Sequence, residues 1–271
     1  ARWSDGHAQT AGDFEYALKR ALDPMSGNVY PFPYYVIKNA EAYNHGDIPD
    51  SDSVGIRASD DATLVITTEE PCPYLPLIMS YKTSVPVPRW QVEKYGNRWS
   101  GADHNISNSS YKLVEWRSGD RLTFELDSYY NGLHKGYLER IVRIISNVET
   151  GISTGISPYE NDEVHQISVS PMELPRVKRD PDLKKELYVN PTFQTWYLYF
   201  QTTKPPFDDV RVRRAIAHAI DRESICRILL QGTGAPAYTM LPPGFPGYTG
   251  DTHRAHQEYN PALAKQLLAE A

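Results

Sequence analysis

The sequence predicts a chain of the α/β class, because stretches with helical spacing alternate with stretches of β-prone residues. The clearest helical stretch is 204–234, KPPFDDVRVRRAIAHAIDRESICRILLQGTG, in which apolar residues recur every three or four positions. Residues 54–58 and 63–68 alternate like the two strands of a hairpin, and 195–200, TWYLYF, is rich in aromatic residues that favour strands. The chain of 271 residues is long enough for more than one lobe.

The first helix is predicted by its start and stop signals. The WSDG sequence at 3–6 indicates a turn. Thr10 can then cap a helix, and Asp13, three residues later, can act as its capping-box partner. Helical periodicity follows until Asp23 and Pro24, where the missing backbone donor of proline stops the helix.

Shorter elements are expected from there to residue 200, with breaks at glycine and proline. The proline-rich segment 27–35, GNVYPFPYY, is expected to be extended or turned. A second hairpin is predicted around Ser118-Gly119-Asp120. We expect helices at 36–43, 75–79, 92–96 and 172–178, and strands or crossing segments at 86–89, 111–116, 121–126, 141–146, 164–169, 187–189 and 195–200.

Two capped helices are predicted within 204–234. Pro205 and Pro206 end what precedes them, and Asp208 or Asp209 can cap the first helix. Asp221 is a second cap signal at the corner, and glycines close the second helix. Farther on, Asn260 and Pro261 cap and start a final helix.

Composition excludes two classes of protein. The formal net charge is −6, which argues against a protein that binds the phosphate backbone of nucleic acids. No apolar run approaches the length of about 18 residues that a membrane-spanning helix needs. The chain is rich in tyrosine, with 19 residues, and a tyrosine ring with its polar tip suits an amphipathic ligand as well as a half-buried sheet position.

No sequence pattern of a catalytic or cofactor-binding site is present. The chain lacks a P-loop, a dinucleotide glycine fingerprint, HExxH, CxxC and G-x-S-x-G. His253 and His256 lie three residues apart in an expected loop, which is fewer ligands than a zinc site normally uses. We therefore expect no catalytic residues, no metal and no cofactor. Cys72 and Cys226 could form one disulfide, but Cys226 is expected instead to be a small buried hydrophobic residue.

Two long runs resemble the family 5 extracellular solute-binding proteins, the peptide-binding components of bacterial ABC importers. They are WSDGHAQTAGDFEYALKRALDP at 3–24 and PPFDDVRVRRAIAHAIDRESI at 205–225. The sequence departs from the family at 108–110, where serines and an asparagine stand in place of the usual glycine. It departs again at 146–171, where two Gly-Ile-Ser copies interrupt the usual helix.

The resemblance implies a two-lobed cleft of the periplasmic-binding-protein type II-like class with an extra α/β domain, incomplete at both ends of this chain. Residues 1–88 would be part of the extra domain, 89–190 part of lobe I and 191–271 the first part of lobe II. The group that pairs with the α-amine of a bound peptide would lie outside the chain.

The function implied by the resemblance is capture of oligopeptides outside the cytoplasm and their delivery to ABC transporter permease subunits. The protein would be a monomer in the periplasm or at the cell surface, with a lipoprotein anchor as an option and no nucleic-acid partner. Tyr30 matches a ligand-facing tyrosine of the family. Trp196, Tyr197 and Tyr199 are further candidate ligand contacts, and packing in a sheet or between lobes is the alternative for all four.

Two other functions stay open on the sequence. Aromatic faces also stack on sugar rings, so the same fold could bind oligosaccharides. A glycoside hydrolase with aromatic subsites is less favoured, because such an enzyme needs a positioned acid and base. The acidic pairs Asp60-Asp61 and Asp208-Asp209 are expected at a turn and a helix start instead.

Overall fold

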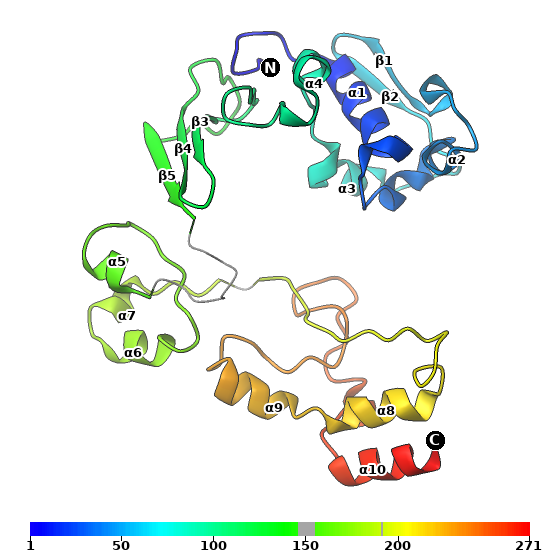
Figure 1. Ribbon diagram of the computed structural model, residues 1–271, viewed down its shortest axis with the longest axis vertical. Coiled ribbons are helices and arrows are strands. Elements are labelled where there is room, and N and C mark those ends of the chain that lie inside the picture. Colours follow the sequence, from blue (N-terminus) through cyan, green and yellow to red (C-terminus); the bar gives the residue numbers. More distant parts are fainter. Residues whose placement is uncertain (146–154, 191) are drawn as a thin grey trace. The chain divides into compact units, whose positions relative to one another are not determined.

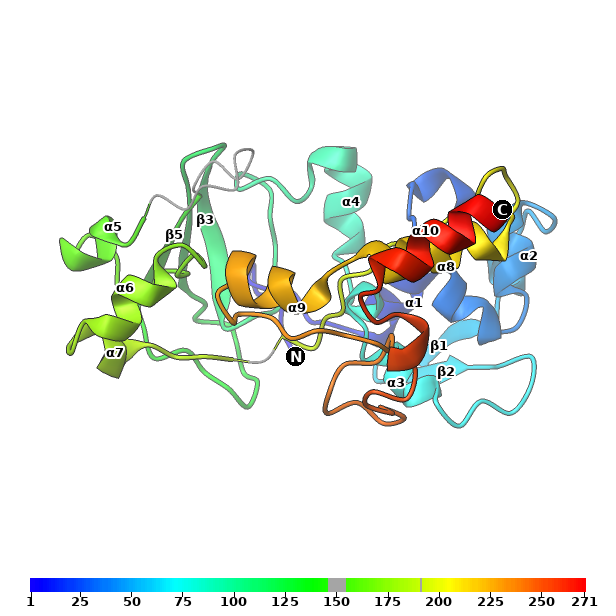
Figure 2. The same ribbon diagram turned by 90° about the horizontal axis from the view of Figure 1, so that it is seen from below.

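The computed structural model describes residues 1–145, 155–190 and 192–271. It divides into two compact units, residues 1–147 and 148–271 (Figures 1 and 2). The expected division of this chain into 1–88, 89–190 and 191–271 stays a prediction.

Helix α1 (Ala11–Leu22) begins and ends as the sequence predicts. The backbone amide of Thr10 donates to Oδ2 of Asp13 over 2.9 Å. The same buried carboxylate oxygen accepts from Nε1 of Trp3 over 3.1 Å. One aspartate therefore satisfies an amide at the helix start and also attaches the N-terminal turn to the helix.

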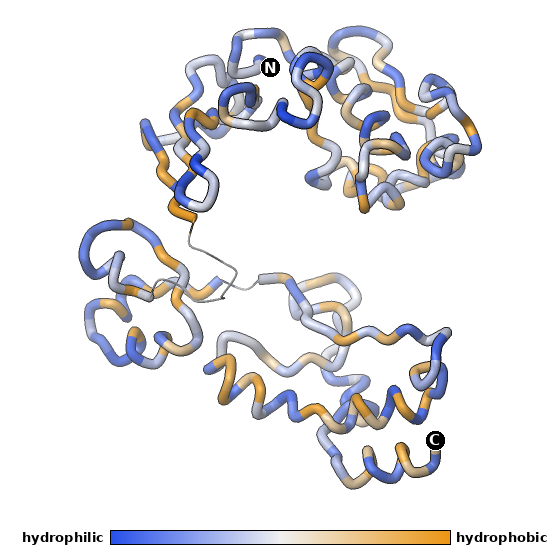
Figure 3. Tube along the Cα trace, viewed as in Figure 1, coloured by the Kyte–Doolittle hydropathy of each residue, from blue (hydrophilic) through white to orange (hydrophobic). Residues whose placement is uncertain are grey.

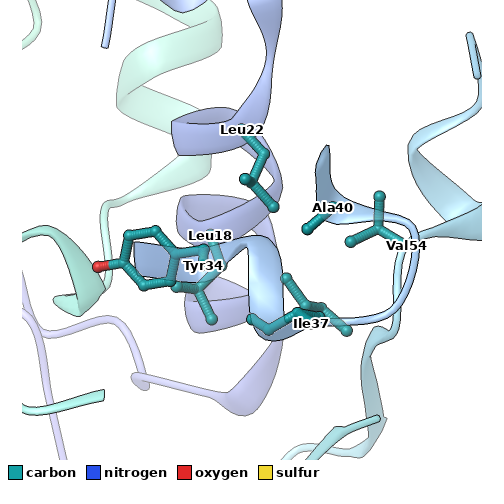
Figure 4. Close-up of a cluster of buried hydrophobic side chains, with 7 residues drawn as sticks. Leu18, Leu22, Tyr34, Ile37, Ala40 and Val54 are labelled. Carbon is teal, nitrogen blue, oxygen red and sulfur yellow. The ribbon is translucent and has the colours of Figure 1, made fainter. Parts of the chain in front are cut away.

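The core of the first unit lies between α1 and a two-stranded hairpin. Strands β1 (Ile56–Asp60) and β2 (Thr63–Ile66) pair antiparallel, with Ile56 opposite Ile66, which confirms the predicted hairpin. Helix α1 packs against the hairpin, and apolar side chains from both elements and from the segment between them are removed from water (Figure 4). The buried cluster consists of Leu18, Leu22, Tyr34, Ile37, Ala40, Val54 and Ile56.

The proline-rich segment and the residues after it fold differently from the expectation. The segment forms a 3₁₀ helix, Phe32–Val36, because the φ angle that proline fixes also suits a 3₁₀ helix. The single helix expected at 36–43 is replaced by the shorter α2 (Ala40–His45). The amide of Lys38 donates to the carbonyl of Thr67 over 2.9 Å, so the chain pairs with the hairpin here and helical hydrogen bonding cannot continue.

The next two helices precede a second sheet. Helix α3 (Leu75–Met79) lies where it is predicted. Helix α4 (Arg89–Tyr95) begins three residues before the predicted start, because Pro88 serves as its N-cap, and it ends at Gly96 with φ 53°. The strand or crossing segment expected at 86–89 is therefore partly helix.

The second sheet of the first unit has three antiparallel strands in the order β3-β4-β5. They are β3 (Tyr111–Arg117), β4 (Arg121–Leu126) and β5 (Arg140–Ile144), which confirms the second hairpin and the strand after it. Gly119 turns the hairpin with φ 74°. Residues 108–110, which lack the family's glycine, have no positive φ, so the substitution causes no left-handed strain there.

The first part of the second unit consists of short helices. They are α5 (Ser157–Glu160), α6 (Leu174–Arg179), which confirms the predicted helix, and α7 (Leu183–Glu186). The last residue of the strand expected at 141–146 and the first Gly-Ile-Ser copy, at 151–153, lie outside the described residues.

The prediction of strands in the second unit is wrong. Among the described residues of that unit, no β-ladder forms at 164–169, 187–189 or 195–200. These segments have strand-like residues, but a ladder also needs a neighbouring strand to accept and donate backbone hydrogen bonds.

The capped corner predicted at 204–234 is confirmed. Helix α8 (Val210–Ala219) starts at Asp209, whose Oδ1 accepts from the amide of Arg211 over 2.7 Å. Helix α9 (Arg222–Ser224) starts at Asp221, whose Oδ1 accepts from the amide of Ser224 over 2.9 Å, and one turn of π-helix extends it. Figure 3 shows hydrophobic residues along both helices.

Helix α10 (Pro261–Glu270) packs against α8. Oδ1 of Asn260 accepts from the amide of Leu263 over 3.1 Å, as the sequence predicts. The imidazole of His218, buried on α8, contacts the carbonyl of Glu258 through Nδ1 over 2.8 Å. The guanidinium of Arg211 donates to the carbonyl of Glu270 at the other end of α10.

The two cysteines are free thiols, Cys72 in the first unit and Cys226 in the second. Cys226 is half-buried rather than fully buried as expected, and burial raises the pKa of its thiol. In the part of the chain that the structure describes, no helix is long and apolar enough to cross a bilayer.

Candidate ligand-binding surfaces

The described residues hold no cluster of three or more His, Cys, Asp or Glu side chains that could bind a metal ion. The rings of His253 and His256 are 6.5 Å apart between centroids, without a third ligand among the described residues. The candidate ligand-binding residues are therefore the aromatic residues that the sequence indicates.

Tyr30 lies on an exposed loop that is fixed to α1. Oδ1 of Asn28 accepts from the amide of Tyr30 over 3.1 Å, and Nδ2 of Asn28 donates to the carbonyl of Ala21 over 2.8 Å. The side chain of Tyr30 is 51% exposed, and its hydroxyl has no hydrogen-bond partner among the described residues. The hydroxyl is therefore free to bond with a ligand.

Phe32 stands beside Tyr30, and sequence reasoning missed it. The two ring centroids are 5.5 Å apart, with 43° between the ring planes, and the side chain of Phe32 is 57% exposed. Phe32 begins the 3₁₀ helix whose Tyr34 is fully buried in the core. The signal in the sequence was a second aromatic residue two positions after Tyr30 in a proline-bounded segment.

The segment 195–200 carries the other three candidates in the second unit. The side chains of Trp196 and Tyr199 are 93% and 85% exposed, and Tyr197 is also exposed. The rings of Tyr197 and Tyr199 have centroids 6.5 Å apart. Among the described residues, no backbone group of 195–200 makes a hydrogen bond. The segment therefore has free amides and carbonyls that another extended chain could pair with.

The structure brings Tyr30 together with Phe32, and Tyr197 together with Tyr199. Tyr30 belongs to the first unit, and the other three candidates belong to the second. That Tyr30, Trp196, Tyr197 and Tyr199 contact a ligand stays a prediction.

A cavity of about 500 Å³ in the second unit is lined mainly by acidic residues. Tyr159 donates its hydroxyl hydrogen bond to Oε2 of Glu186 over 2.5 Å, which raises the pKa of Tyr159. The amides of Leu183 and Asp182 bond to Asp180 and lower the pKa of its carboxyl. These carboxylates are used in local contacts that hold α5 and α7 in place, which is a structural role.

Comparison with known proteins identifies the family. The model described as "Bacterial extracellular solute-binding proteins, family 5 Middle" matches residues 1–271. The chain is 32% identical over 277 residues to the probable deoxycholate-binding periplasmic protein YgiS of Escherichia coli K12, covering 100% of this chain and 50% of that protein. It is 31% identical over 281 residues to the periplasmic oligopeptide-binding protein OppA of the same organism, again covering 100% and 50%.

Solved structures agree on the fold. The murein tripeptide binding protein MppA of Escherichia coli matches with a TM-score of 0.84 and 28% identity, covering 100% of this chain and 53% of that protein. The fold class expected from the resemblance, part of a type II periplasmic binding protein, is therefore confirmed. The chain spans about half the length of the curated relatives it matches.

Proposed function

We propose, because the chain belongs to the family 5 bacterial extracellular solute-binding proteins, that the protein captures oligopeptides outside the cytoplasm and delivers them to ABC transporter permease subunits. The observation that carries this proposal is the family match over the whole chain, together with the oligopeptide-binding and tripeptide-binding relatives. Two relatives are periplasmic, so we place the protein in the periplasm or at the cell surface, with a lipoprotein anchor as one way of holding it there. We propose that it acts as a monomer.

The proposed binding mode combines aromatic contacts with backbone pairing. Tyr30 offers a ring face and a free hydroxyl to the ligand. The rings of Trp196, Tyr197 and Tyr199 flank unpaired backbone groups, which can bond with an extended peptide as a strand does. Water can fill the remaining space around the peptide side chains.

Binding of this kind needs no catalysis. A hydrolase would need an acid and a base held on either side of a bond. The acidic pairs of this chain serve turns and helix starts instead: Asp60 accepts from the amide of Ala62, and Asp209 from that of Arg211. We therefore propose that the protein is not an enzyme and needs no cofactor.

Native mass spectrometry of the full-length protein purified from its own cells tests the ligand class. Co-purified peptides are the expected result. A co-purified oligosaccharide would contradict the proposal, and so would deoxycholate, the ligand named for one relative. Turnover of added oligosaccharides would show an enzyme and would overturn the binding-protein interpretation.

Replacement of Tyr30 by Phe tests the site. The hydroxyl is exposed and unbonded among the described residues, so Tyr30→Phe should leave the melting temperature nearly unchanged. Peptide binding in the full-length protein should weaken by about 0.5–1.5 kcal/mol, the net contribution of one neutral hydrogen bond.

Tyr137→Phe is the matched control, because Tyr137 is fully exposed in the same unit. Isothermal titration calorimetry with the co-purified peptide measures the affinity of both variants for that peptide. Unchanged binding by Tyr30→Phe would show that the hydroxyl is not a contact. A large loss of melting temperature in Tyr30→Ala would show a packing residue instead.

A further inference from the structure

The loop that carries Tyr30 has an unusually apolar exposed surface. Met25 and Val29 are 90% and 81% exposed, and Tyr30 and Phe32 follow within three residues. Exposed apolar side chains that gather on one segment mark a candidate place of interaction.

The same loop carries no charge. Residues 24–37, PMSGNVYPFPYYVI, contain no Asp, Glu, Lys or Arg, although 23% of the chain is charged. An uncharged segment offers a charged peptide side chain no ion pair of its own, so burial of that side chain against the segment would be penalised, whereas burial of an apolar side chain would be favoured.

The backbone that carries the two rings is attached to the fold on both sides. Asn28 joins the loop before Tyr30 to the last turn of α1. After Phe32, the hydroxyl of buried Tyr34 bonds to Thr83 and, over 2.8 Å, to Oγ of Ser84. A backbone segment that is held in place before binding loses little freedom when a ligand arrives.

We propose that Tyr30 and Phe32 form a two-ring subsite that takes an aliphatic or aromatic side chain of the bound peptide, and that Phe32 makes the protein prefer such peptides. This inference rests on the proposed function. The ring planes are tilted by 43° at a centroid distance of 5.5 Å, and both side chains are more than half exposed, so an additional ring or methyl group can pack against the pair. Phe32 is therefore a specificity residue, whereas Tyr30 also offers a hydrogen bond.

The test is calorimetry on the full-length protein with alanine tripeptides and pentapeptides that carry one Phe or one Glu at each position in turn. The wild type should bind at least one Phe peptide more tightly than the matching Glu peptide. Phe32→Ala should weaken that Phe peptide by about 3–10-fold and should change the all-alanine peptide by less than about twofold. Phe32→Leu, which keeps an apolar side chain, should retain more of the preference.

Tyr137→Ala is the control, because it removes a fully exposed aromatic side chain of the same unit outside the proposed subsite. It should leave the preference unchanged. If the wild type binds none of the peptides, the proposed function fails. If peptides bind and Phe32→Ala weakens Phe and Glu peptides alike, or lowers only the melting temperature, the subsite inference fails and the proposed function stands.

Discussion

Removal of the Tyr34 hydroxyl is expected to destabilise the first unit, because that hydroxyl lies in the middle of a directed chain of hydrogen bonds. Oγ of Ser84 lies 3.1 Å from the carbonyl of Ile78, which can only accept, so Ser84 donates there. The Tyr34 hydroxyl must then donate to Oγ of Ser84, over 2.8 Å, and accept from Thr83. Each hydroxyl has one proton, so the direction of the whole chain is fixed.

The cost of Tyr34→Phe follows from what is left behind. Ser84 is buried and keeps its bond to Ile78, but its oxygen loses the donor. Thr83 is only half-buried, so its hydroxyl can donate a hydrogen bond to water instead. One lost hydrogen bond and one buried acceptor without a donor predict a loss of about 1–3 kcal/mol in the free energy of unfolding.

Urea denaturation followed by circular dichroism measures the difference. Tyr43→Phe is the matched control, because Tyr43 packs against the same core and its hydroxyl has no hydrogen-bond partner among the described residues. The control should change the free energy of unfolding by no more than about 0.5 kcal/mol. Equal effects of the two substitutions would refute the hydrogen-bond argument, because each removes one tyrosine hydroxyl beside the same core and, within the described part of the chain, only that of Tyr34 is hydrogen-bonded.

Two further predictions concern a helix cap and a close approach. Asp209→Ala should lower the urea midpoint at pH 7 and Asp208→Ala should not, since only Asp209 accepts from the amide of Arg211. Arg211 lowers the pKa of Asp209 from 3.8 to about 2. The difference in urea midpoint between the two variants should therefore be complete above pH 3.8, the pKa of the unfolded state, and should disappear as the pH falls through about 2. A difference that persists unchanged below about pH 2 would contradict this. Gly55→Ala should cost about 1–3 kcal/mol or more, because a Cβ there would lie 2.5 Å from the carbonyl oxygen of Thr67. In the same denaturation assay, Gly12→Ala, inside α1, should be neutral or stabilising, and equal losses at both glycines would rule out the clash.

The features that the sequence predicted well are local ones. The caps at Thr10, Asp209, Asp221 and Asn260 each need only a side chain and an amide two or three residues away. The two hairpins of the first unit likewise need only alternation and a turn.

The predictions that failed depend on distant partners. Lys38 ends a helical pattern because its amide bonds to Thr67, twenty-nine residues farther on, and nothing near Lys38 signals this. The segment 195–200 has strand propensity, yet no neighbouring strand lies among the described residues.

The candidate site shows the same limit. Tyr30 came from the family resemblance, and its exposure agrees with a ligand contact without testing it. Phe32 emerged only from the structure, because exposure depends on what the rest of the chain covers. Proline spacing alone could not tell an outward ring from Tyr34, which is two residues away and fully buried.

Arg211 connects helix ends that lie about sixty residues apart in the chain. Its amide and guanidinium bond to the carboxylate that starts α8, while the guanidinium also donates to a carbonyl at the end of α10. Arg211 therefore joins the first turn of α8 to a segment about sixty residues farther on, so loss of its guanidinium would remove a contact from both helices.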